Sequence, residues 1–296
     1  MGAQKTALVV GANSKIGSAC LEALIALNYD ITCTYRRDKP NKFDNQNEKL
    51  NLSNINEAES SVWMKSFDVA ILIPSLTLST KFIPLAQKFG VKKYIFLSSY
   101  NTYRFGHTEH YAKFLSLESD ILNNGTQSII LQPTAILGHP HASLCKILFK
   151  KANNTKPILL AKRGQYKYQP IDYRDVASAV IHAATSEKIS PGRYPIAGTE
   201  IVTQSNLYQT LTEVMEQSAK FYYIPSFAIP VIRIVGKVMY NLHPYGEFLS
   251  RFGQDRHCVH EMLPQWKPHF SFRDMCNNIT NEFSRKSQPN AQRRNT

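Results

Sequence analysis

The chain has 296 residues, and its 35 lysines and arginines against 22 aspartates and glutamates give a formal net charge of +13. Hydrophobic residues at 43% and charged residues at 19% are ordinary values for a folded protein, which excludes disordered and fibrous classes. The length fits one large domain or two small ones, and it is sufficient to bury a sizeable core.

The first half of the chain alternates short apolar runs with segments of helical periodicity. Buried strands are predicted at Thr6–Val10, Asp30–Tyr35, Val69–Pro74, Tyr94–Leu97 and Ser128–Leu131. Helices are predicted at Ile16–Leu27, at Lys81–Phe89 with Gly90 as its end, and in a segment that includes Ser116–Leu122. Strands that alternate with helices in this way indicate an α/β fold, a doubly wound parallel sheet with both faces covered.

The second half has a less regular rhythm, which is typical of a smaller, mixed lobe. Helices are predicted at Ala142–Ala152, Asp175–Ser186 and Gln204–Glu216, with a strand-and-turn region at Lys156–Gln169 between the first two. Thr203 is expected to be the N-cap of the third helix. Phe221–Leu242 is expected to be a partly buried helix that follows a proline-rich turn.

A glycine-containing turn lies between the first strand and the first helix. Gly11 can make the tight turn, and Gly17 allows the helix to pack closely on the strand, so that backbone N–H groups at the helix N-terminus face a pyrophosphate. Ser14 stands where the motif has its middle glycine; a serine can adopt negative φ there and donate its hydroxyl to a phosphate. An ordinary strand–helix turn is the alternative, but the context favours dinucleotide binding. The expected cofactor-binding residues of this turn are Gly11, Asn13, Ser14, Lys15, Ile16 and Gly17.

The residues after the second strand favour NADP(H) over NAD(H). An NAD site uses an acid there to bind the ribose 2′-hydroxyl, about 20 residues past the turn. This chain has Arg36 and Arg37 instead, and Lys15 lies inside the turn. These cations match a 2′-phosphate through charge-assisted hydrogen bonds. The alternative is that the two arginines are solvated residues of a turn.

Further segments extend the pattern along most of the chain. They are Asn51-Leu52-Ser53, Asp68-Val69-Ala70-Ile71, Gly90 to Ser99, Leu131 to Gly138 and Gln169 to Ala177. Together with the glycine turn, these segments resemble the extended and atypical branches of the short-chain dehydrogenase/reductase superfamily, including NAD(P)-dependent epimerase-like and NmrA-like proteins. The expected organisation is an NAD(P)-binding Rossmann domain over residues 1–165 and an interleaved C-terminal substrate lobe over 166–284. The basic residues 285–296 include no acid and are expected to form a disordered tail.

The resemblance also assigns cofactor contacts beyond the glycine turn. It places Asn51 and Leu52 near the adenine, and Pro74 and Ser75 in the cofactor cleft. It places Ser98 and Ser99 near the nicotinamide, with Pro133 and Thr134 over the nicotinamide amide.

Active members of that superfamily carry a Tyr-x-x-x-Lys pair on one helix face, in which the lysine lowers the pKa of the tyrosine that acts as general acid. Members of the superfamily have an acidic residue after the lysine of this pair, and Glu118 corresponds to it here. Counted back from Glu118, the positions of the tyrosine and the lysine fall on His110 and Phe114. Tyr111 and Lys113 are two residues apart, which sends their side chains to different helix faces. The candidate catalytic residues are Tyr111, Lys113 and Ser98. The alternative is that the helix has lost the standard chemistry.

Two functions follow from these observations. The first is an epimerase-like or reductase-like enzyme that acts on a small carbonyl or hydroxyl substrate with NADP(H), for which the protein supplies orientation. The second is a non-catalytic NADP(H)-binding protein with a redox-sensing, assembly or regulatory role, which the fold by itself does not exclude.

Five cysteines without a C-x-x-C pair argue against a disulfide framework and a metal site, and they favour a cytoplasmic location. No run of about 18 apolar residues is present, so no transmembrane span is expected. Nucleic-acid binding is not expected, because no basic motif with interleaved aromatic residues occurs. A homo-oligomer and a weak membrane-surface contact through Ile224–Phe252 remain open.

Overall fold

The computed structural model describes residues 4–35, 47–49, 66–83, 90–153, 157–239, 249 and 252–287. The chain divides into two compact units, each made of three segments. Unit 1 comprises residues 1–133, 174–196 and 260–267, and unit 2 comprises residues 134–173, 197–259 and 268–296. The first boundary therefore lies at Pro133 and not at residue 165. The difference arises because Pro133 ends the last strand of the first half, and the chain enters unit 2 directly after it.

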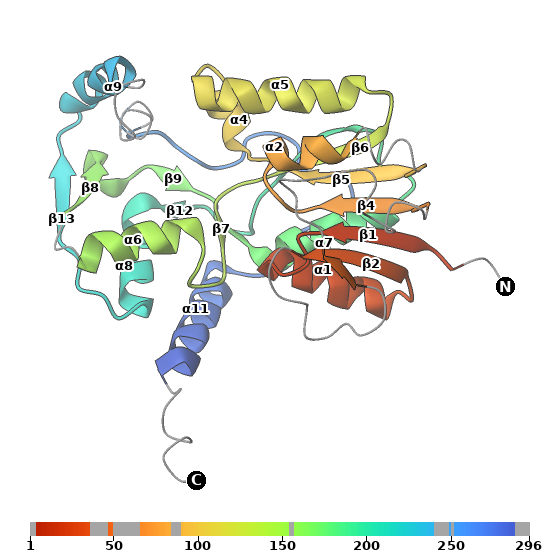
Figure 1. Ribbon diagram of the computed structural model, residues 1–296. Coiled ribbons are helices and arrows are strands. Elements are labelled where there is room, and N and C mark those ends of the chain that lie inside the picture. The colour runs from red at the N-terminus through yellow and green to blue at the C-terminus, as the bar shows by residue number, and fades with distance from the viewer. Residues whose placement is uncertain are drawn as a thin grey trace, which may run out of the picture. The chain divides into compact units, whose positions relative to one another are not determined.

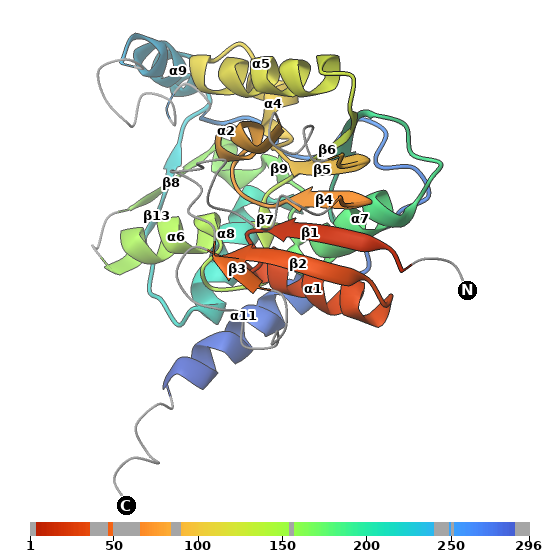
Figure 2. The same cartoon turned by 45° about the vertical axis from the view of Figure 1, so that its right-hand side comes forward.

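Unit 1 is built on a seven-stranded sheet in the order β3-β2-β1-β4-β5-β6-β11, shown in Figures 1 and 2. Every pair of neighbouring strands in it is parallel. The strands are β1 (Thr6–Val10), β2 (Asp30–Tyr35), β3 (Asn47–Lys49), β4 (Val69–Leu72), β5 (Lys93–Leu97), β6 (Gln127–Pro133) and β11 (Gly192–Ile196). The expected doubly wound parallel sheet is confirmed.

Helices cover both faces of this sheet. They are α1 (Lys15–Ala26), α2 (Leu76–Ser79), the 3₁₀ turn η2 (Thr80–Phe82), α4 (Asn101–Phe105), α5 (Glu109–Asn123) and α7 (Tyr173–Thr185). Leu8 and Val10 of β1 pack in one cluster with Leu76 of α2 and Ile121 of α5. The alternate β1 side chains point to the opposite face, where α1 and α7 lie together (Figure 1). Residues 84–89 of the helix predicted at Lys81–Phe89 lie outside the described residues.

The described residues of unit 2 combine short strand pairs with several helices. Its elements are β7 (Ile136–Leu137), α6 (Ser143–Asn153), β8 (Ile158–Ala161), the 3₁₀ turn η3 (Lys162–Gly164), β9 (Lys167–Tyr168), β10 (Ile171–Asp172), β12 (Val202–Thr203), α8 (Gln204–Val214), β13 (Phe221–Ile224), α9 (Ala228–Val238) and α11 (Phe272–Ser287). Thr203 caps α8, because its side chain accepts a hydrogen bond from Asn206 N.

The single helix predicted over Phe221–Leu242 is wrong. The segment begins as β13, which pairs in parallel with β8, and helix α9 starts only at Ala228. Strand pairing satisfies the backbone of Phe221–Ile224, and Pro225 follows the strand, where it cannot continue the ladder. Within the described part of the chain, no helix combines the length and the apolar character that crossing a membrane requires.

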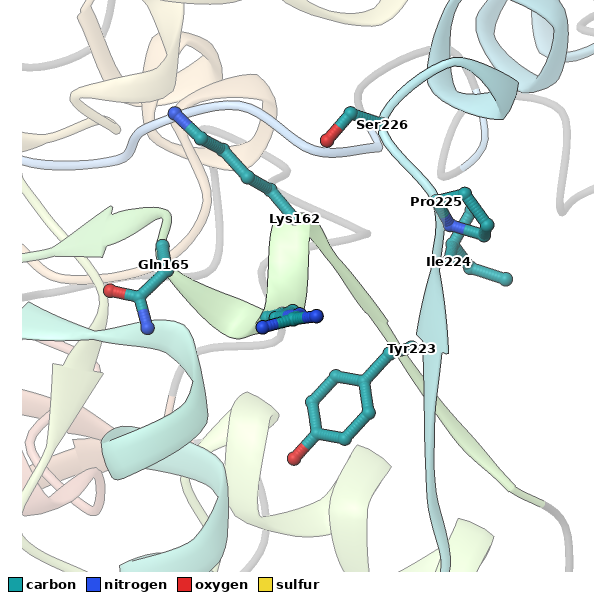
Figure 3. A pocket seen from close by; sticks show the side chains of 7 residues that line it. Lys162, Gln165, Tyr223, Ile224, Pro225 and Ser226 are labelled. Carbon is teal, nitrogen blue, oxygen red and sulfur yellow. The ribbon is translucent and has the colours of Figure 1, made fainter.

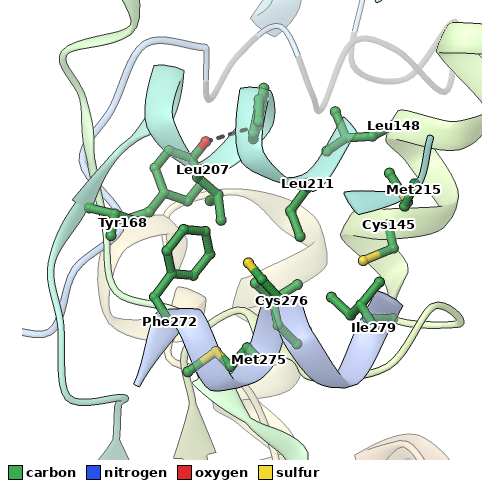
Figure 4. Packing of buried hydrophobic residues seen from close by; sticks show 14 of the residues in the cluster. Cys145, Leu148, Tyr168, Leu207, Leu211, Met215, Phe272, Met275, Cys276 and Ile279 are labelled. Atoms are coloured by element: carbon green, nitrogen blue, oxygen red, sulfur yellow. Dashed lines mark hydrogen bonds between the residues drawn. The ribbon is translucent and has the colours of Figure 1, made fainter. Parts of the chain in front are cut away.

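The core of unit 2 forms where α6, α8 and α11 pack against one another, as Figure 4 shows. Leu207 and Leu211 of α8 are fully buried there, as is Ile279 of α11. Burial raises the pKa of the Cys145 thiol to about 12 and that of the Cys276 thiol to about 11. Both thiols are therefore protonated packing groups at neutral pH.

Candidate functional site

Several of the predicted site residues lie where the parallel strands of the unit 1 sheet end. The glycine turn follows β1, Pro74 and Ser75 follow β4, and Ser98 and Ser99 follow β5. Backbone hydrogen bonds join these strand ends to their neighbours. Ile73 N donates to Val10 O at 3.1 Å, and Ser98 N donates to Leu131 O at 2.9 Å. In open α/β sheets, ligands bind outside the carboxyl ends of the strands. This edge is therefore the candidate dinucleotide site.

Two glycines of the turn are required for different physical reasons. Gly11 has φ +84°, a left-handed conformation that side-chain-bearing residues rarely adopt. Gly17 lies in the first turn of α1, directly against the turn. A Cβ placed on it would overlap Gly11 O and would lie 2.9 Å from Ala12 Cα. Helix α1 can therefore approach the turn this closely only with glycine at position 17.

Ser14 begins α1 as its N-cap. It has φ −74° and ψ 158°, and its Oγ accepts a hydrogen bond from Gly17 N at 2.9 Å. The same hydroxyl donates to Gly11 O at 2.9 Å. The negative φ expected for a serine at this position is present. The hydroxyl closes the turn on itself, so its role in this structure is to fix the geometry of the helix N-terminus.

The loop after β4 lies directly beside the glycine turn. A Cβ on Gly11 would be 3.3 Å from both Ile73 Cβ and Pro74 Cδ. Ser79 Oγ donates to Pro74 O at 3.1 Å and fixes this loop against α2. Ser75 is exposed next to it. The two loops that the sequence predicts at the cofactor are thus adjacent in space.

The remaining cofactor predictions divide between described and undescribed residues. Asn13 and Lys15 are exposed at the start of α1, and Ile16 is half-buried. Four residues predicted to contact the adenosine side of the cofactor lie outside the described residues: Arg36, Arg37, Asn51 and Leu52.

A buried carboxylate organises the end of β5. Glu118 of α5 is fully buried, and its Oε1 accepts a hydrogen bond from Ser98 Oγ at 2.5 Å. Gln132 Nε2 of β6 lies 2.9 Å from both carboxylate oxygens. Arg193 Nε of β11 donates to Oε2 at 2.8 Å. A buried charge persists only when it is paired and hydrogen-bonded, and these three donors meet that requirement.

The source of the positive charge in this network is unexpected. The segment from Leu131 to Gly138 resembles the Arg-Pro-x-x-x-x-Gly segment of epimerase-like proteins. Gln132 stands here at the position of its arginine. Arg193 supplies the cation instead, from the neighbouring strand β11, and its Nη2 also donates to Ser119 Oγ at 2.8 Å. Sequence reasoning used Glu118 only to count helix positions and missed Gln132 and Arg193. Gln132, a polar residue directly after the apolar run Ile129–Leu131, was the available signal.

The candidate catalytic residues of α5 point in different directions. Tyr111 is buried, and its hydroxyl accepts a hydrogen bond from Asn101 Nδ2 of α4 at 3.0 Å. Lys113 is exposed. His110 is also exposed, and its ring contacts that of Phe114 in a tilted arrangement with 5.0 Å between the ring centroids. Phe114 occupies the lysine position of the pattern. The structure therefore does not bring Tyr111 and Lys113 together.

A second tyrosine lies at the same sheet edge with a histidine partner. Tyr100 N donates to Pro133 O at 3.0 Å, which places Tyr100 where β5 and β6 end. Its hydroxyl is 2.8 Å from His260 Nδ1. The His260 ring stacks on Tyr103 at a centroid distance of 4.4 Å. A tyrosine hydrogen-bonded to an imidazole can exchange a proton, and only the fold could reveal this pair.

Thr134 is buried, and its hydroxyl donates to Gln169 O at 2.5 Å inside unit 2. Pro133, the residue before it, ends β6 in unit 1. Among the residues that the structure describes, no group of three or more His, Cys, Asp and Glu side chains is arranged to hold a metal ion.

Neither a family model nor a curated protein matches the chain. Solved structures do match it in fold. The UDP-N-acetylglucosamine 4-epimerase from Methanobrevibacter ruminantium, in complex with UDP-N-acetylmuramic acid, matches with a TM-score of 0.66 at 16% identity, over 96% of this chain and 100% of that one. The UDP-glucuronic acid 4-epimerase from Bacillus cereus, in complex with UDP-glucuronic acid and NAD, gives 0.66 at 14% identity, over 95% and 99% of the two chains.

A third structure gives the same result. The UDP-glucose 4-epimerase of Thermus thermophilus in complex with NAD matches with a TM-score of 0.60 at 14% identity, over 94% of this chain and 99% of that one. Identities this low establish similarity of fold. The fold that the sequence resemblance implied is confirmed, and the chain is similar in fold to these UDP-sugar 4-epimerases.

Proposed function

We propose that unit 1 binds a nicotinamide dinucleotide and that the chain is an epimerase-like or reductase-like enzyme for a small carbonyl or hydroxyl substrate. The observation that carries this proposal is the β1–α1 turn, in which Gly17 packs against the Gly11 carbonyl and Ser14 caps the helix. The N-terminus of α1 offers backbone N–H groups and a favourable dipole to a pyrophosphate.

The finer proposal is a preference for NADP(H). Lys15, Arg36 and Arg37 support it by their charge. The epimerases from Bacillus cereus and Thermus thermophilus are complexes with NAD, so the unphosphorylated cofactor is the direct competitor. The affinities for the phosphorylated and the unphosphorylated cofactor therefore have to be measured side by side.

Fluorescence titration with NADPH and NADH tests both levels of the proposal. We expect Arg36→Glu to weaken NADPH binding by about ten- to a hundredfold, the value of one charge-assisted contact, and to leave NADH binding unchanged. Lys188→Glu, at an exposed lysine of unit 1, is the matched control. Equal affinities for the two cofactors, or no loss of NADPH affinity in Arg36→Glu, would refute the preference for NADP(H), and tighter binding of NADH would assign the site to NAD(H). Wild-type protein that binds neither cofactor would overturn the proposal.

The proposed proton donor is Tyr111, with Lys113 influencing its electrostatics and Ser98 near the nicotinamide. The Tyr100–His260 pair is the competing donor, supported by its 2.8 Å contact at the ends of β5 and β6. The test measures turnover rates of Tyr111→Phe and Tyr100→Phe with a panel of aldehydes, ketones and sugar nucleotides, in the presence of NADPH or NAD⁺. A rate lost only in Tyr100→Phe transfers the role to Tyr100, and a rate lost only in Tyr111→Phe supports the first assignment.

The second candidate is a non-catalytic dinucleotide-binding protein with a redox-sensing, assembly or regulatory role. The observation that favours it is the pair His110 and Phe114 at the tyrosine and lysine positions, while Tyr111 is buried against Asn101. Tight cofactor binding without turnover of any substrate in the panel is the result that this candidate predicts. His110→Ala adds a control, because a rate that falls in this variant identifies the imidazole as a participant in turnover.

A cytoplasmic location is part of the proposal. It is supported by the buried cysteines Cys20, Cys33, Cys145 and Cys276, none of which forms a disulfide, because cytoplasmic proteins keep their cysteines reduced. Burial raises the pKa of Cys20 to about 12, so this thiol is unreactive at neutral pH. Subcellular fractionation with thiol labelling of the unfolded protein tests the location and the redox state together.

A further inference from the structure

Helix α9 of unit 2 exposes an apolar face. The exposed side chains are those of its N-cap residue Phe227 at 82% and of Val231 at 60%, Ile234 at 61%, Val235 at 43% and Val238 at 69% of their full accessible area. At about 100° per residue, these five positions lie within an arc of about 100°. A surface helix normally directs polar residues to solvent, so this face has the reverse of the usual pattern.

The opposite side of α9 holds the helix on unit 2. Ile229 is buried in a cluster with Ala161 and Phe252, against which Ile232 packs. Arg233 Nε donates to Phe252 O at 2.8 Å, and its Nη2 donates to the carbonyl of the following residue. This side anchors α9 on unit 2. The exposed apolar face is therefore not needed to hold the helix in place.

The chain segment that carries this face has only positively charged side chains. From residue 217 to residue 239 the sequence has Lys220, Arg233 and Lys237 and no acidic residue. Lys220 and Lys237 are exposed, and Tyr222 is 57% exposed on the strand that leads toward α9. The segment from Lys220 to Lys237 thus combines apolar residues, aromatic residues and lysines, which is the combination found at a bilayer interface.

A cationic pocket adjoins the chain that enters α9. It has a volume of about 450 Å³ and is shown in Figure 3. Lys162 and Arg163 of η3 and the following Gln165 line one side of it, and Tyr223 to Ser226 line it from the end of β13 and the turn before α9. Such a pocket suits a phosphate group at the edge of the apolar face.

The backbone that presents these two cations is strained. Lys162 has φ +49° and Arg163 has φ +53°, followed by Gly164 at +74°. Left-handed conformations are uncommon for residues that carry a side chain, and they concentrate at functional positions. Gly164 cannot be replaced without strain, because a Cβ there would lie 2.6 Å from Ser205 Cβ. The turn is therefore held in a shape that places two adjacent cations at the pocket.

We propose that unit 2 docks on an anionic phospholipid bilayer. The apolar face of α9 enters the boundary between headgroups and acyl chains, and the pocket of Lys162 and Arg163 takes a lipid phosphate. Charge complementarity selects this partner, because each lysine or arginine near an anionic surface adds to the attraction. A second copy of the chain would instead bring like charges together around the same face.

Co-sedimentation of the full chain with vesicles tests the docking. We expect binding to phosphatidylcholine vesicles that contain phosphatidylglycerol, weaker binding to pure phosphatidylcholine, and a loss of binding with added salt. Ile234→Glu combined with Val238→Glu is expected to lower binding at least about tenfold, because two charges would enter the apolar boundary. Ile201→Glu is the matched control, since Ile201 is 51% exposed in unit 2 but lies outside α9.

Lys162→Asn combined with Arg163→Asn tests the pocket, because asparagine removes the charge and tolerates positive φ. We expect this variant to lose the preference for vesicles that contain phosphatidylglycerol and to keep its binding to pure phosphatidylcholine. We expect each variant to keep the thermal midpoint and the dinucleotide affinity of the wild type, which verifies that it is folded.

Three results would overturn the proposal. The first is wild-type protein that binds no vesicles, and the second is a glutamate double variant that binds as well as Ile201→Glu. The third is a wild-type dimer in light scattering that the glutamate double variant converts to a monomer, which would assign the face to self-association.

Discussion

Gly17 is the residue that allows α1 to approach the β1–α1 turn. Gly17→Ala places a Cβ against Gly11 O and 2.9 Å from Ala12 Cα, so the helix must shift. We expect the free energy of unfolding to fall by about 1–3 kcal/mol and dinucleotide binding to be lost. Denaturant unfolding and cofactor titration measure the two effects. Gly125→Ala is the control, since it adds only the strain of a φ of +70° with no atom within 4 Å, and it should bind normally.

Glu118 shows how a single buried carboxylate fixes the residues around it. In Glu118→Gln the donors Arg193 Nε and Ser98 Oγ lose a charged acceptor. We expect a loss of about 1.5–3 kcal/mol in the free energy of unfolding, the range for hydrogen bonds to charged groups. Asp120→Asn on the same helix is the control, because Asp120 is exposed. Equal urea midpoints for the two variants would contradict a structural role for the network.

At the scale of elements, β1 and β4 are joined at their amino ends by Asp68. Its carboxylate accepts from Lys92 Nζ at 2.6 Å and from Thr6 N at 2.8 Å, and these bonds hold the pKa of Asp68 below its usual value. The stabilisation is therefore present above the unfolded-state pKa of about 3.9 and is lost as pH falls through the lower folded-state pKa. We expect Asp68→Asn to lower the thermal midpoint at about pH 7, with the difference from wild type shrinking below about pH 4. A difference that persists unchanged into acid would contradict this assignment.

At the scale of the whole molecule, unit 1 depends on segments from three parts of the chain. A fragment of residues 1–165 lacks β11, which pairs with β6, and lacks α7, whose Val176, Ala179 and Val180 are fully buried. Each buried valine is worth about 1.5–3 kcal/mol, against a total stability of about 5–15 kcal/mol for a domain. We expect this fragment to show no cooperative urea transition by circular dichroism. A chain of residues 1–287 keeps every described element and should unfold cooperatively, whereas a cooperative fragment of residues 1–165 would argue against the division at Pro133.

The sequence by itself determined the features that depend on neighbouring residues. The strand–helix rhythm of the first half, the glycine turn and the Thr203 cap were all predicted, because side-chain periodicity and capping bonds act over a few residues. The need for glycine at position 17 was also predicted from the sequence, since a helix that follows a strand after a short turn must pack closely against that turn.

Only the tertiary structure decided the partners that lie far apart in sequence. Glu118 pairs with Arg193 across 75 positions, and Tyr100 meets His260 across 160. The strand β13 forms because β8 lies beside it, although its sequence continues into an apolar helix. Local periodicity carries no information about such contacts, because the free energy that selects them comes from burial and pairing that exist only once the chain is folded.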